Sequence, residues 1–104
     1  MAQHEVINRG GSALLLNIRE SVLLPGSMSE VHFFLLIGIS SIRSDRIIWA
    51  MKDYLVDGHS RKELCEKYQI NNGYFSTTLG RLIRLNALAA SLAPYYTDES
   101  SVFD

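Results

Sequence analysis

SRKELCEKYQINNGYFSTTLGRLIRL, residues 60–85, contains two helix patterns separated by a turn. The first pattern opens with a capping box, in which the side chains of Ser60 and Glu63 each bind the backbone of the other residue. The run NNG at 71–73 is typical of a tight turn. The second pattern, over residues 74–91, repeats apolar side chains at helical spacing. Together these features predict a helix-turn-helix unit.

Two positions bear on how the two helices meet. The first helix must approach the second closely, and Cys65 stands where many such units carry alanine, so we expect it to be a packing residue. Four residues later such turns usually have glycine at a positive φ, but this chain has Gln69. Either Gln69 adopts that conformation at a cost of about 1 kcal/mol, or the turn is displaced to residues 71–73.

The second helix has an apolar face and a polar face when its residues are placed at steps of 100°. The expected packing residues of its apolar face are Phe75, Leu79 and Leu82. Its polar face offers arginine, which binds phosphates or a base edge, and threonine, which makes short hydrogen bonds. The candidate DNA contacts are Tyr74, Thr77, Arg81 and Arg84 on this face, flanked by Ser76, Thr78 and Gly80, with Asn72 in the turn and Arg61 and Lys62 at the start of the preceding helix.

Two more helices are predicted before this unit. Ser27 and Glu30 match a second capping box, so a helix is expected to begin at Ser27 and to run to about Ile39. Ser44 is the cap expected for the next helix, which Gly58 ends. The chain then has four helices and no convincing strand. The predicted fold class is all-α, a small helical domain that contains a helix-turn-helix.

The helix expected from Ser27 has apolar residues around its whole circumference, and two leucines near the end of the last helix leave its apolar stripe. A monomer would leave several of these side chains in water. We therefore expect a homo-oligomer, with contacts made by Phe33, Phe34, Leu36, Leu85 and Leu88. The alternative is that the N-terminal arm folds back and covers the same residues within one chain.

Charge divides the chain more sharply than its net value of −1 suggests. Residues 58–93 carry five bases and two acids, whereas residues 94–104 carry three acids and no base. The expected organisation is an N-terminal arm over residues 1–26 without assigned structure, a helical DNA-binding domain over residues 27–93, and an acidic tail over residues 94–104. The basic segment fits a nucleic-acid partner.

Composition excludes several other classes of protein. A chain of 104 residues, 47% of them hydrophobic, fits one globular domain, and a single cysteine forms no internal disulfide. The three histidines have no spacing typical of catalysis or metal binding, so we expect no enzyme, cofactor, metal or small-molecule ligand. The longest apolar run, residues 31–39, is about half of a membrane span, so we expect no membrane contact and a cytoplasmic location.

Three unbroken runs resemble the PapB family of fimbrial operon regulators from enteric bacteria: HSRKELCEKYQINNGYFSTTLGRLIRLNALAA, GSMSEVHFFLLIGISSIRSDR and APYYTDES. The resemblance covers essentially the whole chain without insertions. It implies an oligomeric, all-α transcription factor that binds AT-rich repeats upstream of fimbrial (adhesin) genes, activating at one occupancy and repressing at another, as in fimbrial phase variation. The family's functional positions carry over to Arg61, Cys65, Tyr74, Arg81 and Arg84.

The expected function is therefore that of a transcriptional regulator at the bacterial nucleoid, with double-stranded AT-rich DNA as its partner. The helix-turn-helix favours the major groove, the resemblance leaves the minor groove open, and arginine serves either. The alternative is a helical adaptor that binds a protein, for example RNA polymerase, without touching DNA. The response of duplex binding to salt distinguishes the two hypotheses.

Overall fold

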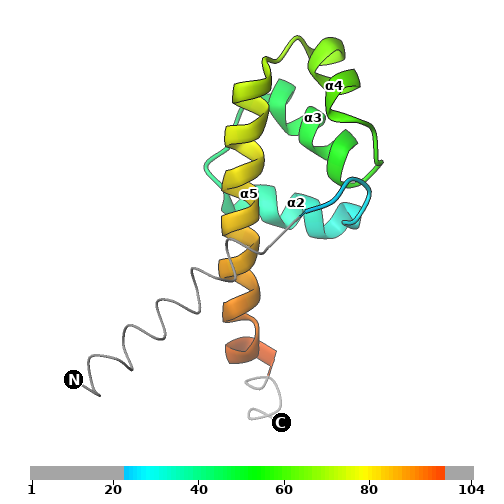
Figure 1. Cartoon of the computed structure of the whole chain (residues 1–104). Coiled ribbons are helices and arrows are strands. Elements are labelled where there is room, and N and C mark those ends of the chain that lie inside the picture. Colours follow the sequence, from blue (N-terminus) through cyan, green and yellow to red (C-terminus); the bar gives the residue numbers. More distant parts are fainter. Residues whose placement is uncertain (1–22, 98–104) are drawn as a thin grey trace, which may run out of the picture.

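The computed structural model describes residues 23–97, which form four α-helices and no strand (Figure 1). The all-α prediction is therefore confirmed. Residues 1–22 of the expected arm and 98–104 of the expected tail lie outside the described residues. The helices are α2 (Glu30–Ile39), α3 (Asp45–Leu55), α4 (Arg61–Tyr68) and α5 (Asn72–Leu92).

Helix α2 begins two residues later than predicted. Ser27 is not its cap, because the Ser27 hydroxyl donates to the carbonyl oxygen of Leu24 at 2.7 Å. Ser29 is the N-cap, and its Oγ accepts from the backbone N–H of His32 at 3.1 Å. Both serines precede an apolar run and could cap the helix. Because the Ser27 hydroxyl is used in the turn that starts at Leu24, Ser29 is the cap.

Two glycines lie where the turn before α2 packs against the turn after α3. Gly26 and Gly58 have φ of +69° and +83°, a region that favours glycine. A Cβ on Gly26 would lie 3.4 Å from the Cα of Gly58, so the two turns pack directly on each other. Gly26 N also donates to the carbonyl of Tyr54, and Met28 N donates to that of Leu55. These contacts fix the direction in which the chain enters α2.

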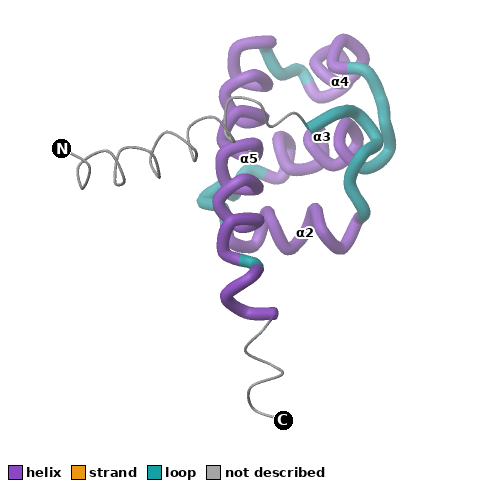
Figure 2. Tube along the Cα trace, turned by 60° about the horizontal axis from the view of Figure 1, so that its bottom comes forward, coloured by secondary structure: helices purple, strands orange, loops and turns teal. Residues whose placement is uncertain are grey.

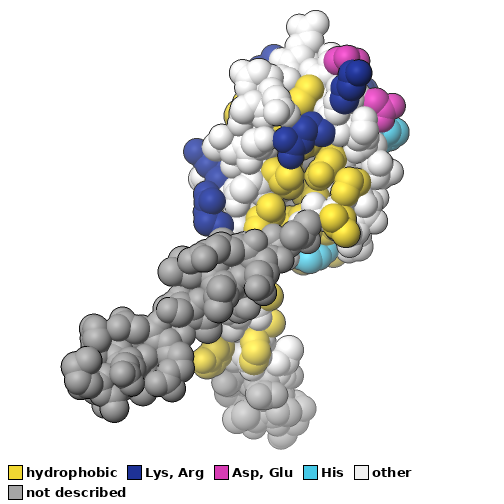
Figure 3. Space-filling model, in the orientation of Figure 1, with side chains coloured by type: hydrophobic (Ala, Val, Ile, Leu, Met, Phe, Trp, Pro, Cys, Tyr) yellow, Lys and Arg dark blue, Asp and Glu magenta, His cyan; other side chains and the backbone are white. Residues whose placement is uncertain are grey.

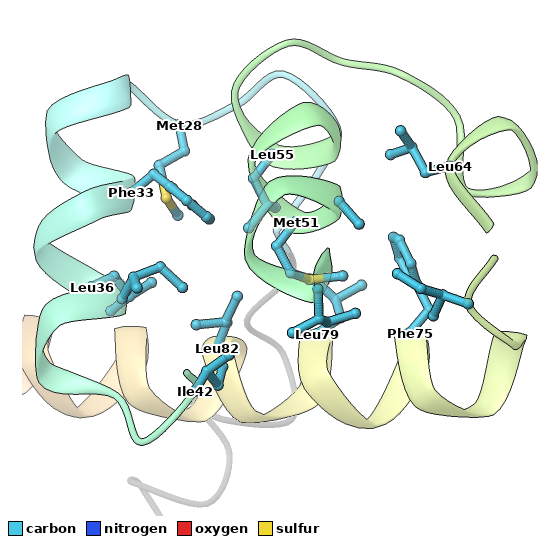
Figure 4. Packing of buried hydrophobic residues seen from close by; sticks show 14 residues of the cluster. Met28, Phe33, Leu36, Ile42, Met51, Leu55, Leu64, Phe75, Leu79 and Leu82 are labelled. Carbon is cyan, nitrogen blue, oxygen red and sulfur yellow. The ribbon is translucent and has the colours of Figure 1, made fainter. Parts of the chain in front are cut away.

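The core lies between α5 and the other three helices, and α3 contacts each of them (Figures 2 and 4). Phe33 and Leu36 are 0% and 3% exposed within it. The prediction that these two residues face a second subunit is therefore wrong, because α2 uses that side to pack against α3 and α5. Other core side chains come from all four helices, among them Met51, Leu55, Leu64, Phe75, Leu79 and Leu82.

Helix α5 is long and extends past the body of the domain (Figures 1 and 2). Its 21 residues correspond to a rod of about 31 Å. It crosses α2 near its middle, where His32 Nε2 lies 2.9 Å from Asn86 Oδ1. Within residues 23–97, no helix combines the length and the apolar character that a bilayer crossing requires.

Candidate nucleic-acid interface

The first helix of the helix-turn-helix begins as the sequence predicts. Ser60 Oγ accepts from Glu63 N at 3.2 Å, and Ser60 N donates to Glu63 Oε1 at 3.1 Å. This capping box lowers the pKa of the Glu63 carboxyl, because the Ser60 backbone N–H and hydroxyl both bind its ionised form. The predicted capping box is confirmed, and it orients the first turn of α4, which carries Arg61 and Lys62.

The turn between α4 and α5 lies at Gln69, which resolves the alternative left open by the sequence. Gln69 has φ 54° and ψ 54°, the left-handed conformation in which glycine is usual. The expectation that residues 71–73 form the turn is wrong, because Asn71 is the N-cap of α5 and accepts from Tyr74 N at 2.7 Å. Asn72 and Gly73 belong to the first turn of α5.

Arg61 joins the two helices at their N-terminal ends. One guanidinium nitrogen, Nη1, donates to Asn72 Oδ1 at 3.2 Å and to Ser76 Oγ at 2.8 Å. Its guanidinium carbon lies 4.9 Å from the centre of the Phe75 ring, within cation–π distance. Arg61 therefore positions the outer residues of α5, in addition to any contact that it makes with phosphate.

Helix α3 supports α4 from behind. Tyr68 donates its hydroxyl to Asp53 Oδ2 at 2.6 Å, and Lys67 Nζ lies 3.5 Å from the same oxygen. The hydrogen bond to Asp53 raises the pKa of Tyr68, and the negative charges of the ionised Tyr68 and of the Asp53 carboxylate raise the pKa of Lys67. Polar contacts thus hold α4 against α3, and Lys67 takes part in them through its ion pair with Asp53.

The side chains of α5 divide as the 100° spacing predicts, with one exception. Phe75, Leu79 and Leu82 are buried in the core. Thr78, expected beside the outer face, is 3% exposed and packs inward, because it lies about 40° from Leu82 around the helix, at the edge of the buried stripe. The exposed residues are Asn72, Tyr74, Ser76, Thr77, Arg81 and Arg84.

The outer face of α5 carries two arginines that form no ion pair within residues 23–97. Among residues 23–97 the ion pairs are Lys52–Asp57 and Lys67–Asp53, so Arg81 and Arg84 have no acidic partner there. Figure 3 shows Lys and Arg side chains in dark blue along the outer side of α5. Charges left unpaired on one exposed helix face are suited to an anionic partner.

Cys65 is half-buried and packs against the core. The structure places it as the sequence reading proposed, on the side of α4 that faces the rest of the domain. Its thiol is one more apolar contact between the helices of the unit.

A hollow beside Arg81 and Arg84 has no counterpart among the features predicted from the sequence. The loop after α2 packs close to the middle of α5 and encloses a volume of about 360 Å³ with it. Five apolar residues line the hollow together with the two arginines: Ile39, Ile42, Leu82, Leu85 and Leu88. No sequence pattern indicated that residues 39–42 would lie beside α5, since this contact depends on the tertiary fold.

A second surface, on α2, is apolar and exposed. Val31, Leu35 and Ile39 are 71%, 67% and 62% exposed. Phe34 lies beside them and packs edge-on against Trp49 of α3, with ring centres 6.1 Å apart. Trp49 had not been identified from the sequence, although an aromatic residue among charged neighbours at 45–53 was a usable signal. We call these five residues the α2 face.

Comparison with known proteins gives one family. Residues 3–96 match the model of the PapB family, described as adhesin biosynthesis transcription regulatory protein. The chain is 86% identical, over 100% of both sequences, to the major pilu subunit operon regulatory protein PapB of Escherichia coli. It is 36% identical to the AFA-III adhesin operon regulatory protein of E. coli, over 83% of this chain and 85% of that one.

Among solved structures, the crystal structure of E. coli FocB is similar. Its TM-score is 0.74 and the identity is 77%, with 83% of this chain and 98% of that chain covered.

Proposed function

The chain belongs to the PapB family of adhesin biosynthesis transcription regulatory proteins, and from this premise we propose that α4 and α5 bind double-stranded DNA at a fimbrial or adhesin operon. The chain is a transcription regulator, and relatives that are named as regulatory proteins agree with the expectation that it is not an enzyme. The proposal adds the surface that touches DNA and assigns roles to its residues.

One observation carries the proposal: the exposed face of α5 presents Thr77, Arg81 and Arg84 without acidic partners among the described residues. In a helix-turn-helix this face of the second helix lies toward the DNA groove. Arg84 and Arg81 then bind phosphates or base edges, and Lys62 binds a phosphate from the start of α4. Tyr74 and Asn72, one turn earlier on α5, extend the contact.

Arg61 has a different role in this proposal. Its Nη1 is engaged by Asn72 and Ser76, so the residue holds the first turn of α5 in place while the rest of the guanidinium can face a phosphate. The preference for AT-rich DNA, which the family resemblance implies, fits two features of arginine and threonine. Arginine enters the narrow minor groove of A-tracts, and a threonine methyl group contacts a thymine methyl group.

The test is binding to an AT-rich duplex as a function of salt. We expect Arg84→Ala and Arg81→Ala each to weaken binding by about 1–3 kcal/mol and to flatten the dependence on salt. Lys67→Gln is the matched control, because it removes a charge that pairs with Asp53 behind the helix-turn-helix. A footprint with a minor-groove competitor identifies the groove. Binding that is absent at low salt would contradict the proposal and favour the protein adaptor. Equal weakening by all three substitutions would contradict the assignment of the DNA contact to this face of α5.

We also propose that the regulator acts as a homo-oligomer through the α2 face. Of the oligomer contacts expected from the sequence, Phe34 lies on this face, whereas Leu85 and Leu88 lie in the hollow beside α5. Gly38 supports the assignment, because the space where its side chain would be is open and allows a partner helix to come close. Burial of each large apolar side chain contributes about 1.5–3 kcal/mol, so three or four offset the entropy lost on association.

Oligomerisation is tested by light scattering at micromolar concentration. We expect Leu35→Ser to shift the protein toward the monomer and to reduce cooperativity on a DNA with several sites. Leu92→Ser is the control, because Leu92 is also exposed but lies at the far end of α5. A wild-type protein that stays monomeric would refute this assignment and leave the N-terminal arm as the cover of the α2 face.

A further inference from the structure

The hollow between the α2–α3 loop and α5 combines two kinds of chemistry at one place. Its apolar side is formed by Ile39, Ile42, Leu85 and Leu88, and Arg81 and Arg84 lie at its border. A ligand that fits it must bring an apolar group of the size of an aromatic ring together with carboxylates. Bare DNA supplies anions but no such apolar group in this position.

A segment of the same chain has this chemistry. The residues after Thr97 read DESSVFD, with three acids and the apolar pair Val102 and Phe103. Their charge of −3 is opposite to that of the segment in which the two arginines lie. We infer that this segment, residues 98–104, binds in the hollow, with Phe103 against the two leucines of α5 and Asp104 beside Arg84.

The reach of the segment agrees with this placement. Leu88 and Arg84 precede Thr97 by nine and thirteen residues, which is about 14 Å and 20 Å along a helix. Phe103 is six residues beyond Thr97, and an extended chain of that length spans about 20 Å. The segment can therefore run back along α5 to the hollow, and Arg81, about 24 Å away, lies at the limit of its reach.

The consequence for DNA rests on the proposed function. The bound segment covers arginines that the proposal assigns to DNA, so the acidic segment competes with the duplex for the same guanidinium groups. If the segment is bound about 70–90% of the time, its release strengthens apparent DNA affinity by about three- to tenfold. Salt weakens both interactions, and the difference is largest at low salt.

The experiment uses the full chain and measures NMR resonances of residues that line the hollow. Phe103→Ser keeps the charge of the segment but removes its apolar group, and Tyr95→Ser is the control, an exposed aromatic residue outside the segment. We expect Phe103→Ser to shift the NMR resonances of Leu85 and Leu88 and to leave those of Val31 on the α2 face unchanged. Tyr95→Ser is expected to leave the resonances of Leu85 unshifted.

The same variants are then titrated with an AT-rich duplex at low salt. Phe103→Ser is expected to bind about three- to tenfold more tightly than the wild type, and Tyr95→Ser like the wild type. Unshifted leucine resonances in Phe103→Ser overturn the inference, whether or not any variant binds DNA. Shifts that occur only at concentrations where the chain self-associates also overturn it, because the segment then comes from a second copy. Shifted resonances with unchanged DNA affinity refute the competition.

Discussion

Replacing Gln69 by glycine is expected to stabilise the domain, although it removes a side chain. Gln69 has φ 54° and ψ 54°, and this left-handed conformation costs a residue with a Cβ about 1–2 kcal/mol. Glycine avoids that cost, but it also increases the conformational entropy of the unfolded chain, which lowers the free energy of unfolding by about 0.4–1 kcal/mol. The net expectation for Gln69→Gly is a gain of about 0.5–1 kcal/mol in the free energy of unfolding.

The assay is urea unfolding followed by far-UV circular dichroism. For a domain of this size the gain raises the urea midpoint with an unchanged slope, and in a thermal melt it corresponds to a rise of about 2–8 °C in Tm. Glu66→Gly is the matched control, because Glu66 is exposed within the same helix but has ordinary helical geometry. There glycine is expected to cost about 1 kcal/mol.

The two substitutions introduce the same residue three positions apart and should have opposite signs. A Gln69→Gly variant that is destabilised as much as Glu66→Gly would refute the reasoning, since the left-handed turn would then carry no strain. The measured sign also decides whether the glycine that is usual in such turns has been lost here at a cost to stability.

Four further predictions concern the supports of the helix-turn-helix. Phe75→Ala is expected to cost about 3–5 kcal/mol, because the ring is fully buried, and to remove most of the cooperative unfolding transition in a thermal melt. Ser60→Ala is expected to cost about 1 kcal/mol by urea unfolding. The pKa of Glu63 is lowered in the folded state, so the ionised carboxylate stabilises the fold. This stabilisation is fully present above the ordinary glutamate pKa and is lost as the pH falls through the lowered pKa. The difference in Tm between the wild type and Glu63→Gln should therefore become smaller at acidic pH. Tyr68→Phe removes the hydrogen bond to Asp53 and is expected to cost about 1–2 kcal/mol, and the pKa of Tyr68 in an absorbance titration should lie above the ordinary tyrosine value.

The sequence predicts those features that short-range chemistry determines. Ser60 and Glu63 are three residues apart, and their mutual hydrogen bonds form as soon as the first turn of α4 forms. Phe75 and Leu82 follow from helical periodicity, because α5 has a polar side to contrast with its apolar one. These elements required no knowledge of the rest of the chain.

The predictions are wrong where two residues, or two sides of a helix, are equally acceptable by local chemistry. Helix α2 is apolar on nearly every side, so periodicity cannot decide that Phe33 and Leu36 face the core and that Leu35 faces outward. Ser27 and Ser29 are both acceptable caps, and the hydrogen bond from Ser27 to the preceding turn makes the choice. In each case the decision is made by residues distant from the pattern or outside it.

The residues proposed to contact DNA were predicted from the sequence only in part. Helical spacing places Thr77 and Arg81 outside, and both are exposed, but the spacing contains no information about what lies beside them. The hollow is formed by the loop at 39–42, which is about forty residues away from α5 in the sequence. Contacts of this kind can be identified only from the tertiary structure.

The dependence of the core on α5 also has a consequence for biosynthesis. Helices α2 and α3 leave the ribosome before α5, and Phe33 and Leu36 are buried partly by the later helix. A nascent chain that ends before Leu82 therefore exposes the inner side of α2 as well as its outer side, and such surfaces promote aggregation. The domain can fold completely only after α5 has been made, so a truncated product that lacks Arg81 and Arg84 is not expected to persist as a folded protein.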